Sequence, residues 1–414
     1  MEYKKSEVLQ YTRENDVKFI RLAFCDIFGT QKNISIMPEK LEEAFENGIP
    51  FDGGSVFGKY DEGVGDLLLV PDATTLSVLP WRPSHGRVVR LYCDIKYPDG
   101  GEFEDDCRKI LEKAAQRAKS MGYTCSVGTE CEFYLFKLDE NGEPTNETYD
   151  RGGYMDVAPA DKGENIRREI CLTLEEMGIS PQTSHHEKGP GQNEIDFNCD
   201  SVCVSADNFI TFKNVVRTVA ARNGLHASFS PKPVEGECGS GLHLNFSLCK
   251  NGRENIFEPR GDGSMTAETQ SFTAGIMSQI AEITAVLNSK RESYCRLGDG
   301  LAPSKISWSH DNRRKLIRIS SRGRNGSHME LRSADSECNP YLALALVLHA
   351  GLDGIEQKMS LAKEDEETGV LPENLTAALD MFENSSFVRK HIPEKLFSGY
   401  IKQKRDEAKL SDAR

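Results

Sequence analysis

The sequence lacks the features that mark membrane-spanning, exported and zinc-binding proteins. Its longest nearly continuous apolar stretch, Tyr341 to Leu352, is far too short to cross a bilayer. The N-terminal residues contain no apolar signal segment, so nothing indicates export and we expect a cytoplasmic protein. No C-x-x-C pair occurs among the 12 cysteines, so we expect free thiols that act as small apolar side chains.

Phosphate-binding loops are also missing. Segment 236–243 (GECGSGLH) begins like a P-loop but has Leu-His where Lys and Ser or Thr belong, and no G-x-G-x-x-G follows a strand pattern. A bound nucleotide would therefore be held by metal ions and arginines. A single arginine more often forms a surface ion pair than a ligand contact. Four candidates lie in or near the segments described below: Arg296, Arg313, Arg318 and Arg332.

The chain has fewer basic than acidic residues. The chain has 51 Lys and Arg residues against 65 Asp and Glu residues, which gives a net charge of −14. This balance argues against a nucleic-acid binder and against docking on an anionic membrane. It also disfavours a bare polyphosphate or dicarboxylate as a ligand, unless divalent cations offset the charge locally.

The chain length predicts more than one domain. At 414 residues the chain is too long for one ordinary core, so we expect a small domain followed by a large one. The turn sequence YPDGG at 97–101 is the clearest boundary signal and gives domains 1–100 and 101–414.

Periodicity and glycine content predict the main elements within these domains. Glycine-rich segment 51–72 is predicted to be a long loop. The patterns further predict a strand over 17–24 and helices over 105–121, 272–287 and 340–351, the last of them apolar on all sides and therefore buried.

Four short segments with strand-like alternation place polar residues on one strand face. Residues at i and i+2 of a strand point to the same side. The polar groups are Glu130 and Glu132 in 126–136, Glu187 and Glu194 around a Gly-Pro-Gly turn, His243, Asn245 and Ser247 in 239–248, and Glu330 and Arg332 in 329–333.

These groups favour a metal cage over the alternatives. One such pair alone is best explained by a solvated sheet face or an ion pair. Four segments that together supply five glutamates and one histidine favour a metal site, because burying carboxylates without a cation is costly. Mostly oxygen donors with a single imidazole suit Mg²⁺ or Mn²⁺. Six ligands are too many for one ion that also holds substrate, so we expect two ions, an arrangement that stabilises phosphoryl transfer.

Taken together, the segments resemble glutamine synthetase of the bacterial type I class. The matching motifs run in family order over nearly the whole chain: FDGGS, GTECEFYLF, GGYMDVAP, HHEKGPGQNEIDF, PKP…GSGLHLNFSL, WSHDNRRKLIRI, MELRSAD and NPYLALA. The resemblance implies an α+β fold with a small N-terminal β-grasp domain and a large catalytic domain. It also implies a homo-oligomer, a dodecamer of two hexameric rings with active sites between neighbouring subunits.

The reaction implied by the resemblance has two steps. ATP phosphorylates the γ-carboxylate of glutamate, and ammonia then displaces phosphate to give glutamine. By motif, one metal would be held by Glu132, Glu187 and Glu194, and the other by Glu130, His243 and Glu330. The remaining implied contacts are Gly239, Arg296 and Arg332 for glutamate, Arg313 and Arg318 for the phosphates, Asn245 and Ser247 on the nucleotide side, and Tyr154 with Asp52 of the adjacent subunit for ammonium.

Several positions depart from the family pattern. The family flap K-R-L-V-P-G-Y-E-A-P carries a glutamate that helps deprotonate ammonium, whereas segment 295–303 (CRLGDGLAP) is one residue shorter and has Leu301 in its place. A short segment at 363–368 replaces the loop that some relatives adenylylate, so we predict that this control is absent. Four further replacements are Cys238 for Asn, His328 for Arg, Cys199 for an aromatic residue and Gln182 for Glu.

Three functions remain open at this point. The six metal ligands favour an active ligase, and glutamate–ammonia ligation is the commonest activity of the type I class. Leu301 and the shortened flap instead favour transfer to a larger amine, because related γ-glutamyl-amine ligases also lack the flap acid. The replacements at Cys238, His328 and Cys199 motivate a third hypothesis, a non-catalytic paralogue that binds glutamate or glutamine.

Overall fold

The N-terminal part of the chain is a twisted sheet with three helices. The computed structural model describes residues 3–58, 63–82, 85–320 and 326–412. Strands β1 (Val17–Cys25) and β6 (Arg87–Lys96) pair in parallel at the centre, and the sheet order is β2-β1-β6-β4-β3 with β5 beside β6. The other elements are β2 (Gln31–Ile36), β3 (Ile49–Asp52), β4 (Asp66–Pro71), β5 (Ser77–Val78), α1 (Lys5–Glu14), α2 (Leu41–Asn47) and α3 (Gly53–Phe57).

The prediction of one long loop over 51–72 was wrong. The segment contains helix α3, which begins where the Asp52 carboxylate accepts a hydrogen bond from the Ser55 amide, at 3.1 Å. It also contains strand β4, whose alternate residues Leu67 and Leu69 are fully buried. Glycine content hid both elements, and residues 59–62 lie outside the described part of the chain.

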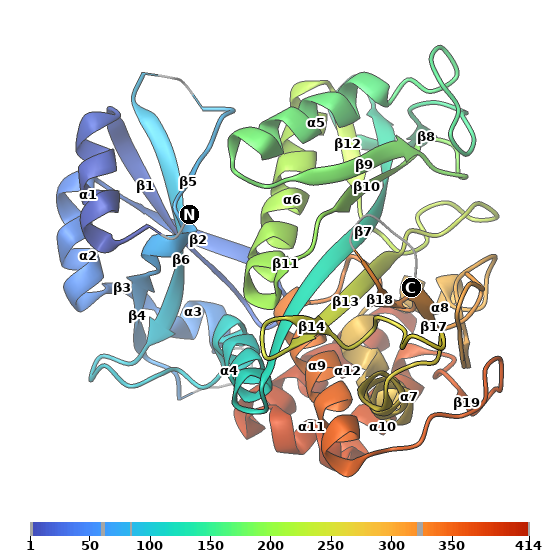
Figure 1. The fold of residues 1–414 in the computed structure, drawn as a ribbon. Helices are drawn as coiled ribbons and strands as arrows, with labels where there is room; N and C mark the ends of the chain where they lie inside the picture. The colour runs from blue at the N-terminus through green and yellow to red at the C-terminus, as the bar shows by residue number, and fades with distance from the viewer. Residues whose placement is uncertain (1–2, 59–62, 83–84, 321–325, 413–414) are drawn as a thin grey trace.

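The rest of the chain builds a larger, mostly antiparallel sheet of eleven strands, which runs diagonally across the molecule in Figure 1. Its main order is β16-β17-β18-β13-β7-β10-β9. These strands are β16 (Trp308–Ser309), β17 (Ile317–Ser320), β18 (His328–Leu331), β13 (Leu242–Lys250), β7 (Tyr123–Leu138), β10 (Gln192–Phe197) and β9 (Pro181–His186). The four attached strands are β8 (Pro144–Thr148), β11 (Asp200–Ser201), β12 (Leu225–Ser228) and β14 (Glu254–Asn255).

Helices cover this sheet and close the core. The predicted helices at 105–121, 272–287 and 340–351 are confirmed as α4 (Cys107–Ser120), α7 (Ala267–Leu287) and α9 (Pro340–Gln357). The rest are α5 (Glu164–Glu176), α6 (Val202–Arg222), α8 (Arg291–Arg296), α10 (Leu375–Asn384), α11 (Ser386–His391) and α12 (Glu394–Asp412), and a small β15 (Lys305–Ile306) pairs with β19 (Gly369–Val370). None of the helices in these described ranges is long and apolar enough to cross a membrane.

Helices α7 and α9 approach each other very closely. A Cβ atom placed on Gly275 would lie 2.2 Å from the Ala350 carbonyl oxygen, so only glycine allows this crossing. Every residue of α9 from Pro340 to Gly354 is buried, which agrees with its apolar sequence on all sides. The helix pair is therefore tightly packed within the core.

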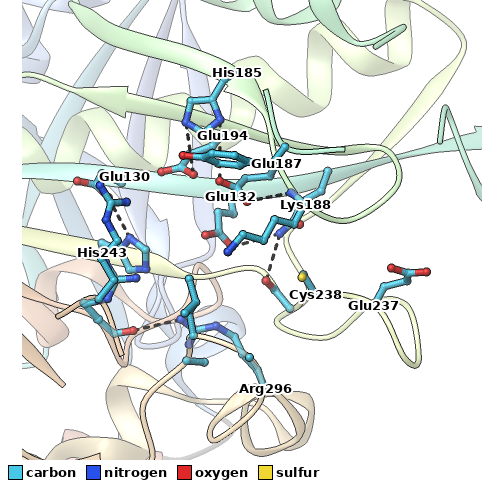
Figure 2. Close-up of a pocket in the computed structure, with 18 of the residues that line it drawn as sticks. Glu130, Glu132, His185, Glu187, Lys188, Glu194, Glu237, Cys238, His243 and Arg296 are labelled. Carbon is cyan, nitrogen blue, oxygen red and sulfur yellow. Dashed lines mark hydrogen bonds and ion pairs between the residues drawn. The ribbon is translucent and has the colours of Figure 1, made fainter. Parts of the chain in front are cut away.

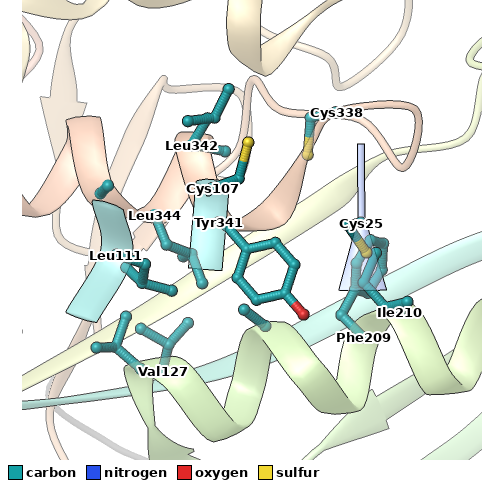
Figure 3. Packing of buried hydrophobic residues seen from close by; sticks show 14 of the residues in the cluster. Cys25, Cys107, Leu111, Val127, Phe209, Ile210, Cys338, Tyr341, Leu342 and Leu344 are labelled. Carbon is teal, nitrogen blue, oxygen red and sulfur yellow. The ribbon is translucent and has the colours of Figure 1, made fainter. Parts of the chain in front are cut away.

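The cysteines behave as small apolar side chains. All 12 are free thiols, and Cys25, Cys107 and Cys338 lie among apolar residues of the core, as Figure 3 shows. Burial raises the pKa of the Cys125 thiol, and nearby cysteines add to this effect. These buried thiols are therefore protonated and unreactive, in line with the prediction from their spacing.

Candidate active site

Strand register brings the acidic residues together on one face of the large sheet. Glu130 and Glu132 alternate along β7, and the neighbouring strand β10 places Asp196 opposite Glu130 and Glu194 opposite Glu132. On the other side of β7, strand β13 places His243 opposite Glu130. Further along, β18 sets Glu330 opposite Asn245 of β13, and β17 sets Arg318 opposite Glu330. Residues from five adjacent strands thus meet in one place. Figure 2 shows Glu130, Glu194 and His243 of this group close together.

The first group consists of Glu130, His243 and Glu330, whose potential ligand atoms all lie within 4.8 Å of one another. The Nδ1 atom of His243 is 2.9 Å from a Glu130 oxygen and 3.6 Å from a Glu330 oxygen. Burial alone would raise the pKa of Glu130, but the hydrogen bond and charge of His243 outweigh it and hold the pKa well below the usual range.

Arginines neutralise the buried member of this group. Glu330 has no solvent exposure and accepts hydrogen bonds from Arg318 and Arg332. Because both cations reach the carboxylate directly, Glu330 is compensated without a metal ion. Asn245 of the neighbouring strand β13 donates to Glu130 at 2.9 Å and fixes the orientation of that carboxylate.

The second group is Glu187 and Glu194, and the structure adds His185 to it. The His185 ring lies 3.9 Å from a Glu187 oxygen through Nδ1 and 3.7 Å from a Glu194 oxygen through Nε2. Burial raises the pKa of Glu194 well above its ordinary value, and the negative charges of Glu132, Asp196 and Glu187 raise it further.

Glu132 stands slightly apart from the two residues with which the resemblance groups it. Its Oε2 atom accepts hydrogen bonds from the Gly241 amide at 2.8 Å and from Gln192 at 3.2 Å. Within the described ranges, no set of ligand atoms closer than 4.8 Å joins Glu132 to Glu187 and Glu194. A rotation of the Glu132 side chain is needed before all three could share one ion.

The donor set fits hard divalent cations. Carboxylate oxygens dominate both groups, and each group contains one imidazole, a composition that suits magnesium-like ions better than zinc. Glu187, Glu194 and Asp196 lie together, and among the described residues the basic side chain within 4 Å of Glu187 and Glu194 is His185. A cation would relieve the repulsion that raises the pKa of Glu194.

A third cluster consists of Asp150, Asp161 and His186, and these side chains are paired with other protein groups. His186 is fully buried, donates from Nε2 to the Asp150 carboxylate at 2.8 Å, and lies 2.6 Å from the Glu187 carbonyl oxygen through Nδ1. The Asp161 carboxylate is paired with Arg167. This network anchors the β9–β10 turn, and so it fixes the backbone of Glu187.

The two acidic groups open into a cavity of about 860 Å³. The predicted arginines and Gly239 line it, namely Arg296, Arg313, Arg318 and Arg332. Arg296 is only 3% exposed and donates to the Ser333 carbonyl at 2.9 Å and to the Arg332 carbonyl at 3.2 Å, and its burial lowers its pKa. A Cβ on Gly241 would lie 2.5 Å from the Arg296 guanidinium, so glycine leaves room for this side chain.

Tyr154 lies at the rim of the cavity. It is 46% exposed, and its ring meets the edge of His185 with centroids 5.5 Å apart. The Lys188 amine lies 5.8 Å from the Tyr154 ring centroid. The ring therefore closes one side of the cavity without being packed in place.

Four predicted site residues do not line the cavity of their own chain, and one of them is Glu330, which is fully buried against Arg318 and Arg332. Asp52 begins helix α3 on the N-terminal sheet and faces Ser55. Asn245 is hydrogen-bonded to Glu130, and Ser247 is buried farther along β13. The lining residues of this cavity all come from the part of the chain that follows the N-terminal sheet.

The flap segment does reach the cavity. Asp299, Leu301 and Ala302 are among its lining residues, and Asp299 pairs with Lys232 across the opening. Cys238 also lines the cavity, and its carbonyl accepts a hydrogen bond from Tyr134 at 2.6 Å. The other replaced positions, Gln182, Cys199 and His328, are not lining residues.

Sequence reasoning missed several lining residues, namely Thr183, His185, Lys188, Gln192, Asp196 and Glu237. Asp196 could have been found, because it continues the alternation of Glu194 along β10. His185 precedes a fully buried histidine, and only the fold shows which of the two rings faces the cavity.

Comparisons with known proteins agree with this architecture. Residues 16–98 match the family model described as glutamine synthetase, β-grasp domain, and residues 104–414 match glutamine synthetase, catalytic domain. A metal-dependent ligase with an N-terminal β-grasp domain is the class that the fold and the site define. The chain belongs to the glutamine synthetase family.

Individual relatives cover nearly the whole chain. The glutamine synthetase of Methanosarcina mazei is 44% identical over 412 residues, which cover 96% of this chain and 92% of the relative. That of Clostridium saccharobutylicum is 42% identical and covers 98% and 95%. A solved structure of ligand-free GmaS superimposes with a TM-score of 0.89 at 28% identity and covers 99% and 97%.

Proposed function

We propose that the protein is a glutamate–ammonia ligase, which uses ATP to activate the γ-carboxylate of glutamate and condenses it with ammonia to give glutamine. The observation that carries the proposal is the joint placement of two carboxylate–imidazole groups and four arginines around one cavity, in a chain of the glutamine synthetase family. Relatives that are 44% and 42% identical over nearly full length are named glutamine synthetases, which supports the same activity.

The metal roles follow the two acidic groups. Glu130, His243 and Glu330 would hold one Mg²⁺ or Mn²⁺ ion, and Glu132, Glu187 and Glu194 the other, with His185 close enough to join. When bound, the ions would supply charge neutralisation for phosphate oxygens. The family in general uses ATP and divalent metals.

The arginines supply the rest of the positive field. Arg313 and Arg318 would stabilise the phosphoryl group in transit, because Arg318 already points its guanidinium at the metal-facing carboxylate of Glu330. Arg296 and Arg332, with the open backbone at Gly239, would bind glutamate. Asn245 and Ser247, which share a face of β13 with His243, would act on the nucleotide side.

We further propose how the subunits assemble. Members of the family are generally oligomeric, and Asp52 lies outside the cavity of its own chain. A dodecamer of two hexameric rings would let Asp52 reach the cavity of the adjacent subunit and complete the ammonium pocket with Tyr154. In this proposal the domains are 1–100 and 101–414, and the protein works in the cytoplasm.

A second candidate function is γ-glutamyl transfer to a larger amine. Leu301 lines the cavity where the family places a glutamate, so this side of the opening is apolar, and Asp299 is already paired with Lys232. An alkylamine would gain contact with Leu301, whereas ammonium would lose a base. A non-catalytic glutamate-binding role, suggested by Cys238, has less support, because five of the six predicted ligands line one cavity. The sixth, Glu330, has a carboxylate oxygen within 4.8 Å of ligand atoms of Glu130 and His243.

One experiment separates these functions. Phosphate release from ATP is measured with glutamate, Mg²⁺ or Mn²⁺, and a panel of ammonium, alkylamines and polyamines. We expect turnover with ammonium. Turnover only with an alkylamine or polyamine would replace the first proposal by the second. No turnover with any amine, despite measurable metal binding, would leave the non-catalytic role.

A further inference from the structure

A second cavity, of about 520 Å³, lies between the N-terminal sheet and helix α6. In Figure 1 this is the junction of the blue sheet and the yellow-green helix at the centre of the molecule. The two sides are joined by hydrogen bonds from Asn214 of α6 to Gln31 of β2 at 2.7 Å, and between Tyr92 of β6 and Thr211 of α6 at 3.0 Å. The cavity therefore belongs to both parts of the chain.

Four arginines line this cavity, and no carboxylate is among the described residues that line it. They are Arg21, Arg82, Arg90 and Arg222. Arg222 is exposed and lies 3.6 Å from Glu169, so its charge is partly balanced. The other three have no acidic partner in the described parts of the chain, although the protein as a whole carries a net charge of −14.

Arg90 gives the clearest sign of a missing ligand. It is only 7% exposed, its guanidinium lies 3.9 Å from the centre of the Tyr92 ring, and its Nη1 atom is buried without a hydrogen-bond partner. A buried guanidinium with an unpaired donor is costly, because the lost hydration is not replaced. An anion in the cavity would supply the missing acceptor.

Arg21 and Arg82 place further positive charge in the same space. Burial lowers the pKa of Arg21, and the like charge of Arg82 lowers it further. Leu79 and Trp81 line the wall beside them and offer an apolar surface. Guanidinium groups match carboxylate and phosphate oxygens in paired geometry, and the apolar wall suits a short carbon or ring body.

We propose that this cavity binds a small organic dianion, either a dicarboxylate or a phosphate monoester, which clamps the N-terminal sheet to helix α6. Its volume is within the range of small-molecule pockets. Arg21, Arg82 and Arg90 would hold the ligand from the sheet side, and Thr211 and Asn214 would face it from α6. The site is separate from the catalytic cavity, since the two share no lining residue.

Isothermal titration calorimetry on the full-length protein tests this proposal. The metal-free protein, prepared on a chelating resin, is titrated in low-chloride buffer with straight-chain dicarboxylates from malonate to adipate and with glycerol 3-phosphate. The two arms distinguish the carboxylate from the phosphate ligand. We expect saturable binding in one arm, accompanied by a rise in melting temperature.

Variants place the binding in this cavity. Arg82→Gln changes an exposed side chain that forms no ion pair with the described residues and should leave folding intact, and Arg21→Gln tests a second contact. Each should weaken binding by about tenfold or more, because a charge-assisted hydrogen bond is lost. Arg253→Gln, an exposed arginine elsewhere, and Arg313→Gln in the catalytic cavity should bind as the wild type does.

Three results would overturn the proposal. They are the absence of saturable binding in both arms, unchanged affinity in both Arg82→Gln and Arg21→Gln, and loss of binding in Arg313→Gln. The last result would place the ligand in the catalytic cavity. This test measures binding and not turnover, so its failure would not contradict the proposed ligase activity. In the same way, a protein without ligase activity could still bind the dianion in this cavity.

Discussion

Glu132 of β7 and Glu194 of β10 lie directly opposite each other on adjacent antiparallel strands. Two carboxylates in such a pair repel, and this repulsion adds to burial in raising the pKa of Glu194. Without a bound cation, the repulsion between these carboxylates therefore destabilises the folded protein at its candidate active site.

Removal of one charge should stabilise the metal-free protein. In Glu194→Gln we expect an increase in unfolding free energy on the order of 1 kcal/mol in the absence of metal, because a buried like-charge contact disappears. Thermal unfolding with and without Mg²⁺ or Mn²⁺ measures this. The wild type should gain stability from the metal and the variant much less, while Glu140→Gln, an exposed change, should match the wild type. A metal-free variant that is less stable than the wild type would contradict the assignment.

Loss of Glu132 should abolish turnover. Glu132→Ala removes a predicted metal ligand and also leaves the Gly241 amide without its acceptor, while Gln192 keeps only its hydrogen bond to the Gly239 carbonyl. We expect phosphate release to fall by at least about a hundredfold while the fold is kept. Glu237→Ala, which removes a different carboxylate of the same cavity, is the matched comparison. Persistent activity in Glu132→Ala would mean that the metal assignment is wrong.

The flap position should control the choice of amine. Leu301→Glu restores an acid at the cavity lining, where it could accept a proton from ammonium. We expect kcat/KM for ammonium to rise about tenfold or more relative to kcat/KM for an alkylamine. Leu301→Gln, of similar size but without charge, separates the effect of the proton acceptor from that of shape. Equal changes in both variants would exclude the base role.

Mixed oligomers should recover activity that neither parent has. Asp52 lies on the N-terminal sheet, away from the cavity that contains Glu132. If neighbouring subunits share a site, subunits with Asp52→Ala and subunits with Glu132→Ala together contain some intact sites. We expect each pure variant to be inactive and co-refolded mixtures to regain a fraction of wild-type phosphate release. No recovery in verified mixed oligomers would contradict the shared site.

A histidine pair far from the site should make stability sensitive to acid. The rings of His349 and His391 stack with centroids 3.9 Å apart. The pKa of His349 is lowered to about 3 by burial and by the nearby positive charges of His391 and Arg117. The pKa of His391 is lowered to about 4, chiefly by burial. Because the unfolded chain takes up protons near pH 6.5 and the folded chain does not, stability is full above that pH and falls below it.

The variant His349→Gln should lose part of this acid sensitivity. At pH 5 the wild type should have lost about 2 kcal/mol through His349 that the variant does not lose. Denaturant unfolding at pH 8 and at pH 5 measures the difference, and the pH 8 values serve as the reference since both rings are neutral there. A constant gap between the two proteins at both pH values would refute the linkage.

Much of the fold was predictable from periodicity, and the exceptions have physical reasons. Helix α9 was recognisable because its residues are apolar on every side, and strand β7 because Glu130 and Glu132 alternate with buried residues. Helix α3 was not, since its five residues depend on the Asp52 cap rather than on an apolar stripe. Short elements of this kind are fixed by tertiary contacts that a local pattern does not contain.

The same limit applies to the candidate site. The spacing of Glu187 and Glu194 pointed to a shared region, but strand pairing decides that His185 joins them and that Glu132 turns toward Gly241. The arginines of the second cavity, such as Arg21 and Arg90, are distant in sequence and carry no motif. Only the folded chain brings them together.

The acidic groups of the site occupy alternating positions on paired strands. The site therefore tolerates changes in loop length but does not tolerate insertions within the strands. Loops such as the flap can gain or lose a residue without moving Glu130 relative to His243, because the ladder between β7 and β13 sets their spacing. A single-residue insertion within β7 would instead turn every following carboxylate to the opposite face. Lineages of this fold can therefore diversify their substrates through loop lengths, whereas insertions and deletions in the central strands would be eliminated by selection.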